Sequence, residues 1–299
     1  MQRLLEWDDL RFFLELTRCG TILATGEKMG VKHSTVSRRI DKLEESLGVV
    51  LFDRRRSGYT LTEAGTRLTP YAEQMESAHL GAIDECSGQL GSVSGIVRVG
   101  TPEAFGIRIL APSLHKLYSE SPGLHVELMA QPQFPSLVTR EVEILVTLEP
   151  PKVGRYKFAR LAEVNYYLYG APSYLASRPS ITGVNDLAQH DFVDYIHDGS
   201  VSERYRFLAE VIPEPRRSFT TTSVLAQRAA AAAGMGLVIL APYVAQEGSE
   251  LINVFPSESL ITRTLWIATP EDLFRIKRIR RVWDFIREVA EAHPDLQVR

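Results

Sequence analysis

The side chains best suited to recognise another molecule stand together in one short run, Lys-His-Ser-Thr-Val-Ser-Arg-Arg, at positions 32–39. Short hydroxyl groups can reach the edges of nucleic-acid bases, and arginines pair with guanine or with phosphate. The members of this run that we expect to contact DNA are Lys32, His33, Ser34, Thr35, Ser37, Arg38 and Arg39. They can act together only if one rigid element presents them on the same side.

A helix is the element that the spacing around this run indicates. The apolar residues follow one another at intervals of four, three and four, which places them on one helical face. These residues are Val36, Ile40, Leu43 and Leu47. A shorter helix from Thr21, its N-cap, to Met29 precedes a tight turn at Gly30 and Val31. Two helices joined in this way, with polar side chains outside, are typical of a helix-turn-helix that enters the major groove.

A basic turn between two short β segments follows these helices. Val49 to Phe52 and Tyr59 to Leu61 flank the cations Arg54, Arg55 and Arg56. Such a wing lays cations along the phosphate backbone, so we expect all three arginines to contact phosphates. The whole chain carries a formal net charge of -3, which means that any contact with nucleic acid must be local. Positions 28–56 carry the local excess of positive charge that such a contact needs, with eight Lys or Arg against four Asp or Glu.

Several runs at the N-terminus match a known domain. They are Leu-Arg-Phe-Phe at 10–13, Val-Ser-Arg-Arg-Ile at 36–40, Leu-Glu-Glu-Ser-Leu-Gly at 43–48, Leu-Phe-Asp-Arg at 51–54 and Leu-Thr-Glu-Ala-Gly at 61–65. With them, residues 8–72 resemble the DNA-binding domain of the LysR-type transcriptional regulators. The resemblance implies a bacterial, cytoplasmic regulator of transcription that binds double-stranded DNA as a homodimer or homotetramer. It also makes RNA polymerase a candidate partner.

Four positions depart from the family's pattern. Leu23 stands where the family has a threonine that contacts phosphate, and Gly26 weakens its helix by roughly 0.5–1 kcal/mol relative to alanine. Lys32 and His33 replace the usual Ser-Gln, so the second helix lacks its N-cap hydroxyl unless Ser34 supplies one. We therefore expect a base preference that differs from that of relatives.

A long helix is predicted from its N-cap Thr62 to about Leu90, although Pro70 lies inside it. Apolar residues recur along it at heptad spacing from Ala64. The helix could pack on its own domain, but the small residues favour pairing with a second copy. We expect the dimer seam to comprise Leu68, Tyr71, Met75, Ala78 and Ala82. The domains would then be 1–61 for the winged helix-turn-helix, 62–90 for the linker helix, and 91–95 for a hinge rich in Gly and Ser.

Residues 96–299 alternate between strand and helix patterns, which indicates an α/β domain with a covered sheet. Expected elements include a strand at Tyr166 to Tyr169 and an Ala-rich helix at Val224 to Ala233. The resemblance implies a two-lobed effector-binding domain like the periplasmic binding proteins. One lobe would hold about 96–163 and 266–299, and the other about 164–265.

A small-molecule effector would bind beyond the carboxyl ends of strands, beside helix N-termini. The candidates are Thr101, Pro102, Glu103, Thr147, Tyr195, Thr220, Thr221 and Thr222, with Asn165 and His197 as weaker ones. Each threonine could instead be an ordinary helix cap. A carboxylate at Glu103 disfavours an acidic ligand, so a less acidic ligand and a regulator without any ligand both remain open.

The sequence lacks the motifs that would indicate other classes of protein. Gly91-Ser92-Val93-Ser94-Gly95 has valine where a hydrolase needs its serine, and the glycines near Gly26 and Gly234 fit no nucleotide motif. An enzyme domain fused to a DNA-binding domain is therefore the less favoured alternative. Two cysteines without a cluster of His or Cys indicate neither zinc nor a disulfide framework. We expect no catalytic residues, no metal, no cofactor and no contact with a membrane.

Overall fold

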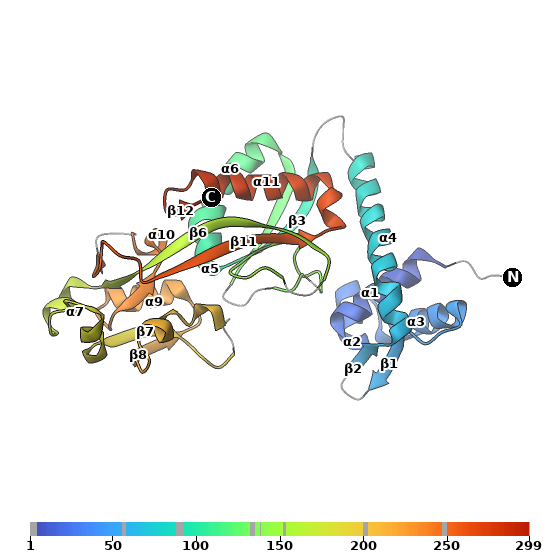
Figure 1. Cartoon of the computed structure of the whole chain (residues 1–299). Coiled ribbons are helices and arrows are strands. Elements are labelled where there is room, and N and C mark those ends of the chain that lie inside the picture. The colour runs from blue at the N-terminus through green and yellow to red at the C-terminus, as the bar shows by residue number, and fades with distance from the viewer. Residues whose placement is uncertain are drawn as a thin grey trace.

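The computed structural model describes residues 5–55, 58–87, 93–131, 135–137, 139–151, 154–199, 203–246 and 250–298. The N-terminal domain starts with α1 (Trp7–Cys19), α2 (Ile22–Met29) and α3 (His33–Leu47) (Figure 1). Gly20 and Gly30 end the first two helices in the left-handed conformation, which glycine adopts without steric cost. The Thr21 hydroxyl accepts a hydrogen bond from the Ala24 N–H at 3.2 Å, so the predicted N-cap is confirmed.

The wing is a two-stranded antiparallel hairpin of β1 (Phe52–Arg55) and β2 (Gly58–Leu61). Its first strand begins later than expected because Val49 and Val50 are exposed and form no strand. Phe52 is the residue that turns inward, and its ring lies 5.3 Å from that of Phe13. This aromatic pair joins the wing to the helices in one hydrophobic core.

The linker helix is α4 (Glu63–Ser87), with Pro70 inside it. The Thr62 hydroxyl accepts a hydrogen bond from the Gly65 N–H at 3.1 Å and so caps the helix as predicted. Residues 88–92, which include the expected end of the helix at Leu90 and part of the expected hinge, lie outside the described residues. Positions 94 and 95 of that hinge belong instead to the strand β3 (Ser94–Thr101).

The effector domain has two sheets in its described part. The larger has the order β10-β6-β11-β5-β3-β4, with β9 and β12 also paired to β6, and the smaller joins β7 and β8 in parallel. The strands not yet given bounds are β4 (Gly123–Ala130), β5 (Ile144–Thr147), β6 (Tyr156–Gly170), β7 (Asp191–Tyr195), β8 (Arg216–Thr221), β9 (Val238–Leu240), β10 (Ile252–Asn253), β11 (Ile261–Pro270) and β12 (Leu296–Gln297).

Helices cover these sheets on both lobes (Figure 1). They are α5 (Glu103–Phe105), the π turn η1 (Gly106–Leu110), α6 (Ala111–Glu120), α7 (Pro172–Ala176), η2 (Val184–Gln189), η3 (Glu203–Tyr205), α8 (Phe207–Val211), α9 (Val224–Ala232), α10 (Pro242–Ala245), η4 (Leu273–Arg275) and α11 (Lys277–Ala292). Within the described ranges, no helix has the length and apolar character to cross a membrane.

Two long antiparallel strands, β6 and β11, run through both lobes (Figure 1). The expected strand at 166–169 was too short, because the first part of β6 alternates between exposed and partly exposed residues rather than forming an apolar run. The pairing shifts register between Leu265 and Trp266, which is where the lobe boundary was predicted. The two-lobed fold is confirmed, and its lobes share continuous strands.

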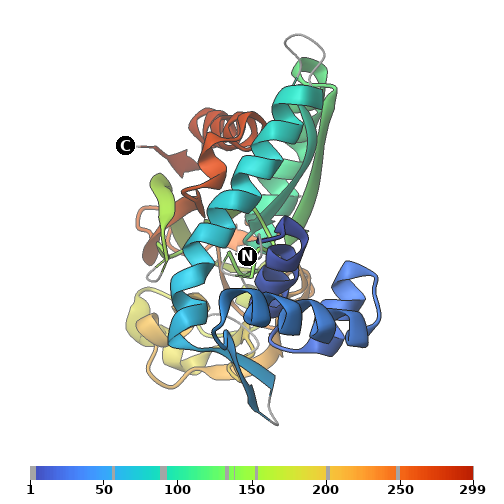
Figure 2. The ribbon, with the colours of Figure 1, turned by 90° about the vertical axis from the view of Figure 1, so that its right-hand side faces the viewer.

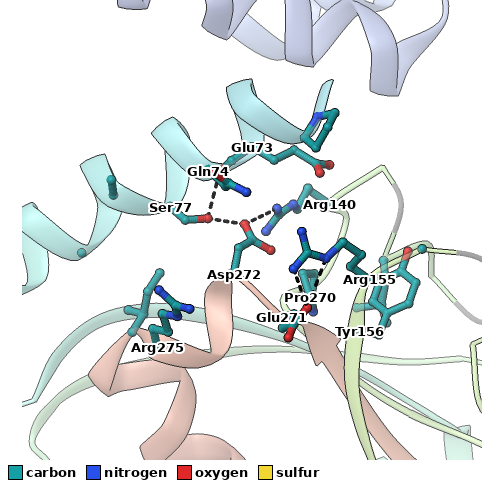
Figure 3. Close-up of a pocket in the computed structure, with 16 residues that line it drawn as sticks. Glu73, Gln74, Ser77, Arg140, Arg155, Tyr156, Pro270, Glu271, Asp272 and Arg275 are labelled. Atoms are coloured by element: carbon teal, nitrogen blue, oxygen red, sulfur yellow. Dashed lines mark hydrogen bonds and ion pairs between the residues drawn. The ribbon is translucent and has the colours of Figure 1, made fainter. Parts of the chain in front are cut away.

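The linker helix is fixed to both domains at neighbouring residues. On one side, the buried guanidinium of Arg18 on α1 donates to both carboxylate oxygens of Glu76, at 2.9 and 2.6 Å. On the other side, the Ser77 hydroxyl donates to Asp272, which also accepts a hydrogen bond from Arg140 at 2.7 Å (Figure 3). We call Ser77, Arg140 and Asp272 the linker joint. It lies where α4 passes along the effector domain (Figure 2).

A pocket of about 760 Å³ opens beside the linker joint, and Glu73 points into it (Figure 3). Burial raises the pKa of the Glu73 carboxyl, and the positive charge of Arg140 offsets only part of this effect. The folded protein therefore holds a proton on Glu73 more tightly than the unfolded chain does.

Replacing Gly65 by alanine should destabilise the N-terminal domain. An added Cβ would lie 2.3 Å from the backbone oxygen of Leu51, so the wing would have to move away from α4. We expect a loss of about 1–3 kcal/mol, measured as a lower midpoint of thermal unfolding. Gly81→Ala is the matched control in the same helix, where the Cβ meets nothing within 4 Å and alanine should be neutral or slightly stabilising. Equal effects of the two changes would contradict this packing.

Glu73→Gln should raise the melting temperature at pH 8 and have less effect at pH 5. A carboxyl with a raised pKa destabilises the folded state above that pKa, and the loss is recovered as pH falls toward its ordinary value of 4.5. Glutamine removes the charge at every pH. Glu63→Gln is the control, because Glu63 is an exposed residue of the same helix. A lower melting temperature for Glu73→Gln at pH 8 would show that the charge pairs favourably with Arg140.

Candidate nucleic-acid interface and ligand cleft

The outer side of α3 carries the predicted DNA contacts. Its inner side is buried at Val36, Ile40 and Leu43. Of the predicted contacts, Lys32, His33, Ser34 and Arg38 are exposed, while Thr35 and Ser37 are half-buried. Lys32 occupies the N-cap position and gives no side-chain cap, so Ser34 does not replace the missing hydroxyl. The first N–H groups of α3 therefore lack a side-chain acceptor and suit a phosphate.

The two adjacent arginines of α3 have different surroundings. Arg39 donates to Asp9 of α1 at 2.9 Å, and Asp9 is only 3% exposed. Lys42 lies 3.3 Å from the same carboxylate and 2.7 Å from Glu6. The hydrogen bond to Asp9 raises the pKa of Arg39, which stays charged. Arg38, by contrast, forms no ion pair with any residue that the structure describes, so its guanidinium is available to a partner.

The wing arginines divide in the same way. Arg54 pairs with Asp41 and with Glu44 of α3, the latter at 3.1 Å. Glu44 also accepts hydrogen bonds from the N–H groups of Leu51 and Phe52, which fixes the wing to α3. Arg55 is exposed, with only a distant approach of 4.0 Å to Asp53. Arg56 lies outside the described residues.

The exposed side of α4 matches the predicted dimer seam in part. Tyr71 and Met75 are 67% and 44% exposed, and Ala78 and Ala82 continue the row. Leu68, expected in the same row, instead packs against the N-terminal core together with Ala64 and the buried Ala72. The first turns of α4 therefore pack on their own domain, the later turns present an exposed apolar row, and pairing with a second copy stays a prediction.

The cleft between the lobes brings together three of the predicted ligand residues, Pro102, Glu103 and Tyr195. They line a cavity of about 20 Å³ with aromatic side chains that sequence reasoning missed. These additional side chains are Tyr166, Tyr205, Phe207 and Tyr243. They come from β6, η3, α8 and α10, which are distant in sequence, and no spacing rule connects them.

Glu103 bridges the two lobes. Its carboxylate accepts hydrogen bonds from the Ser223 hydroxyl and from the Val224 N–H, both at 2.8 Å. Ser223 is the N-cap of α9, so the alternative that a threonine of the 220–222 run caps this helix does not hold. The helix expected at Val224 to Ala233 is present as α9, and its N-cap is the residue directly after the 220–222 run.

The remaining ligand candidates lie apart from the lining of this cavity. The Thr101 side chain is fully buried, and Thr147 is 5% exposed. Thr220, Thr221 and Thr222 belong to the end of β8 and the turn after it, where the Thr221 hydroxyl accepts from the Ser223 N–H. Two weaker candidates also have partners of their own, since Asn165 accepts from Thr262 and His197 contacts Asp194.

Two family models match this chain. The description "LysR substrate binding domain" covers residues 90–291, and "Bacterial regulatory helix-turn-helix protein, lysR family" covers residues 7–66. The transcriptional regulator PtxR of Pseudomonas aeruginosa is 24% identical over 291 residues, which are 95% of this chain and 93% of PtxR.

Solved structures show the same fold. ArgP from Mycobacterium tuberculosis gives a TM-score of 0.71 at 18% identity, covering 97% of this chain and 98% of ArgP. The virulence activator AphB of Vibrio cholerae gives 0.55 at 23% identity, covering 94% and 98% of the two chains. The two matched domains correspond to the helix-turn-helix that contains α3 and to the two-lobed α/β domain. This protein belongs to the LysR family of bacterial transcriptional regulators.

Proposed function

We propose that this protein binds double-stranded DNA at specific sequences as a homodimer or homotetramer, and that a small molecule in the inter-lobe cleft controls its action on transcription. The observation that carries the first part is the outer side of α3. It combines exposed Lys32, His33, Ser34 and Arg38 with a helix N-terminus that has no side-chain cap.

The division of the cations supports this function. Arg39, Lys42 and Arg54 neutralise Asp9, Glu6, Asp41 and Glu44 inside the domain. They hold α1, α3 and the wing in one orientation, and the outward cations can then meet the phosphates of one groove together. In this proposal Arg38 reads bases, Arg55 contacts phosphate, and Arg39 acts mainly by positioning α3.

The exposed row on α4 supports a dimer. Tyr71 and Met75 are large side chains that are 67% and 44% exposed on one face of the helix, an apolar surface that a second copy could cover. Pairing of two copies of α4 would place two α3 helices for two half-sites on the DNA. RNA polymerase is the further partner through which such a regulator would act, and the cytoplasm is where it would meet DNA.

A regulator that needs no ligand is the second candidate. The observation in its favour is that Glu103 already fills the N-terminus of α9, beside a cavity of only about 20 Å³. Either way, a change in the effector domain would reach α3 through the linker joint, because α4 is bonded to both domains there.

Arg38→Ala should affect mainly DNA binding, and Arg39→Ala should affect mainly thermal stability. Arg38→Ala should leave the melting temperature unchanged but weaken binding by about 1–3 kcal/mol, or roughly 5- to 150-fold, and relax the preference at one base position. Arg39→Ala should lower the melting temperature, because it leaves the buried Asp9 without its closest partner. The measurements are thermal unfolding and fluorescence anisotropy on DNA selected from a random pool by the wild-type protein. If Arg38→Ala kept wild-type affinity and sequence preference, α3 would not be the reading helix in the manner proposed.

Arg55→Ala should weaken binding to all DNA sequences to a similar degree. Loss of one phosphate contact should reduce the slope of log K against log salt by about 1. Binding measured at several salt concentrations tests this. Arg155→Ala is the control, since Arg155 is an equally exposed arginine of the effector domain, paired with Glu271. An unchanged slope for Arg55→Ala would remove the wing residue from the interface.

A further inference from the structure

A carboxylate of the protein itself occupies the place where a helix N-terminus would otherwise attract an anion. Glu103 reaches from α5 across to α9 and accepts hydrogen bonds from the Ser223 hydroxyl and the Val224 N–H. An acidic ligand would have to displace this carboxylate, and the helix dipole already favours the charge that is there. The cleft is therefore poorly suited to a carboxylic acid.

The rest of the lining consists of aromatic rings. Those of Tyr166 and Phe207 lie 4.4 Å apart, those of Tyr195 and Tyr205 lie 5.0 Å apart, and Phe207 is 5.8 Å from Tyr205. All four side chains are buried, and Tyr243 closes the same cavity. Burial raises the pKa of each tyrosine, so the rings stay neutral. A cluster of neutral aromatic faces attracts cations through its π electrons.

The charged groups in and around the cavity also favour a positively charged ligand. Glu103 is the ionisable acid of the lining, and the cavity has no Lys, Arg or His among its lining residues. Nearby charges are compensated by partners outside the cavity. Asp194 pairs with Arg217 at 2.9 Å, and Arg263 pairs with Glu210, neither of which lines the cavity. The stacking of Arg263 on Phe207, at 5.3 Å, shows that this ring already accepts a cation on one face.

We infer that the effector cleft binds a small organic cation of the alkylammonium type, with Glu103 as its counterion and the tyrosine and phenylalanine rings as its walls. This inference rests on the proposed control by a small molecule. On binding, Glu103 would exchange the Ser223 hydroxyl and the Val224 N–H for the cation, and α9 would lose its contact with the other lobe.

The two lobes are closed over this cavity, with Glu103 bridging them. A cavity of about 20 Å³ has room for one water molecule and not for an alkylammonium ion. Entry therefore requires the lobes to separate, and among the residues that the structure describes, the bridges from Glu103 to α9 and from Glu149 to Arg204 resist this. Binding exchanges the first of these bridges for a contact between Glu103 and the ligand. The ligand would thus act by changing how the two lobes are held together.

Three probes of almost identical shape and different charge test the proposal on the full-length protein. They are choline, its neutral isostere 3,3-dimethylbutan-1-ol, and the anion 3,3-dimethylbutanoate. We expect choline to raise the melting temperature in a concentration-dependent way and to bind at least tenfold more tightly than the alcohol in calorimetry. The anion should give no shift.

Two variants separate a ligand role of Glu103 from a structural one. Glu103→Gln keeps a hydrogen-bond acceptor for Ser223 and Val224 but loses the charge, so it should weaken choline binding at least tenfold and leave alcohol binding unchanged. Ser223→Ala is the matched change on the opposite side of the bridge. It frees Glu103 from one partner and should bind choline as tightly as the wild type or more tightly.

Each contrary result overturns the inference. Equal binding of choline and the alcohol would mean that charge is not recognised, and stabilisation by the anion would mean that Glu103 is readily displaced. Binding of none of the three, or of choline equally to wild type and Glu103→Gln, would also reject it. DNA binding by the same preparations is measured in parallel. Intact DNA binding with no response to choline would reject the cation site and leave the DNA-binding function standing.

Discussion

The arrangement of the whole molecule depends on two adjacent side chains of α4. Glu76 is held by the buried Arg18 of the N-terminal domain, and Ser77 is held by Asp272 of the effector domain. Adjacent helical residues point about 100° apart, so these two bonds fix α4 from different sides. Neither domain can rotate about the helix without breaking a hydrogen bond that is at least partly shielded from water. If the lobe that contains Asp272 moved, α4 would connect that movement to the domain that contains α3.

Within the N-terminal domain, the charges that hold the fold are distinct from those offered to a partner. Asp9 is almost fully buried, and a buried carboxylate without a cation would be strongly destabilising, so Arg39 and Lys42 are required by the fold itself. Arg38, one position before Arg39, points about 100° around the helix axis from it and away from Asp9. The basic character of this region thus overstates the charge available for phosphates, because a share of it is used internally.

Much of this architecture could be predicted from the sequence, and the reasons for success and failure are physical. Local rules found the helix caps at Thr21 and Thr62 and the end of α2 at Gly30, since each depends on neighbouring residues alone. The long strand β6 was underestimated because its first half is partly solvated. The aromatic walls of the cleft were missed because Tyr166, Tyr205 and Tyr243 come from elements far apart in the sequence and meet only in the folded lobe. Glu103 was identified, but its role as a bridge depends on the position of Ser223, about 120 residues away.

The sharing of β6 and β11 between the lobes has a mechanical consequence. Since both strands continue from one lobe into the other, the lobes cannot separate like two bodies on a free pivot, and any opening must twist a paired ribbon whose hydrogen bonds stay intact. The irregular register at Leu265 and Trp266 is the most compliant point of that ribbon. Affinity for a ligand in the cleft would then include an elastic contribution, set by the torsional stiffness of two strands that need not touch the ligand at all.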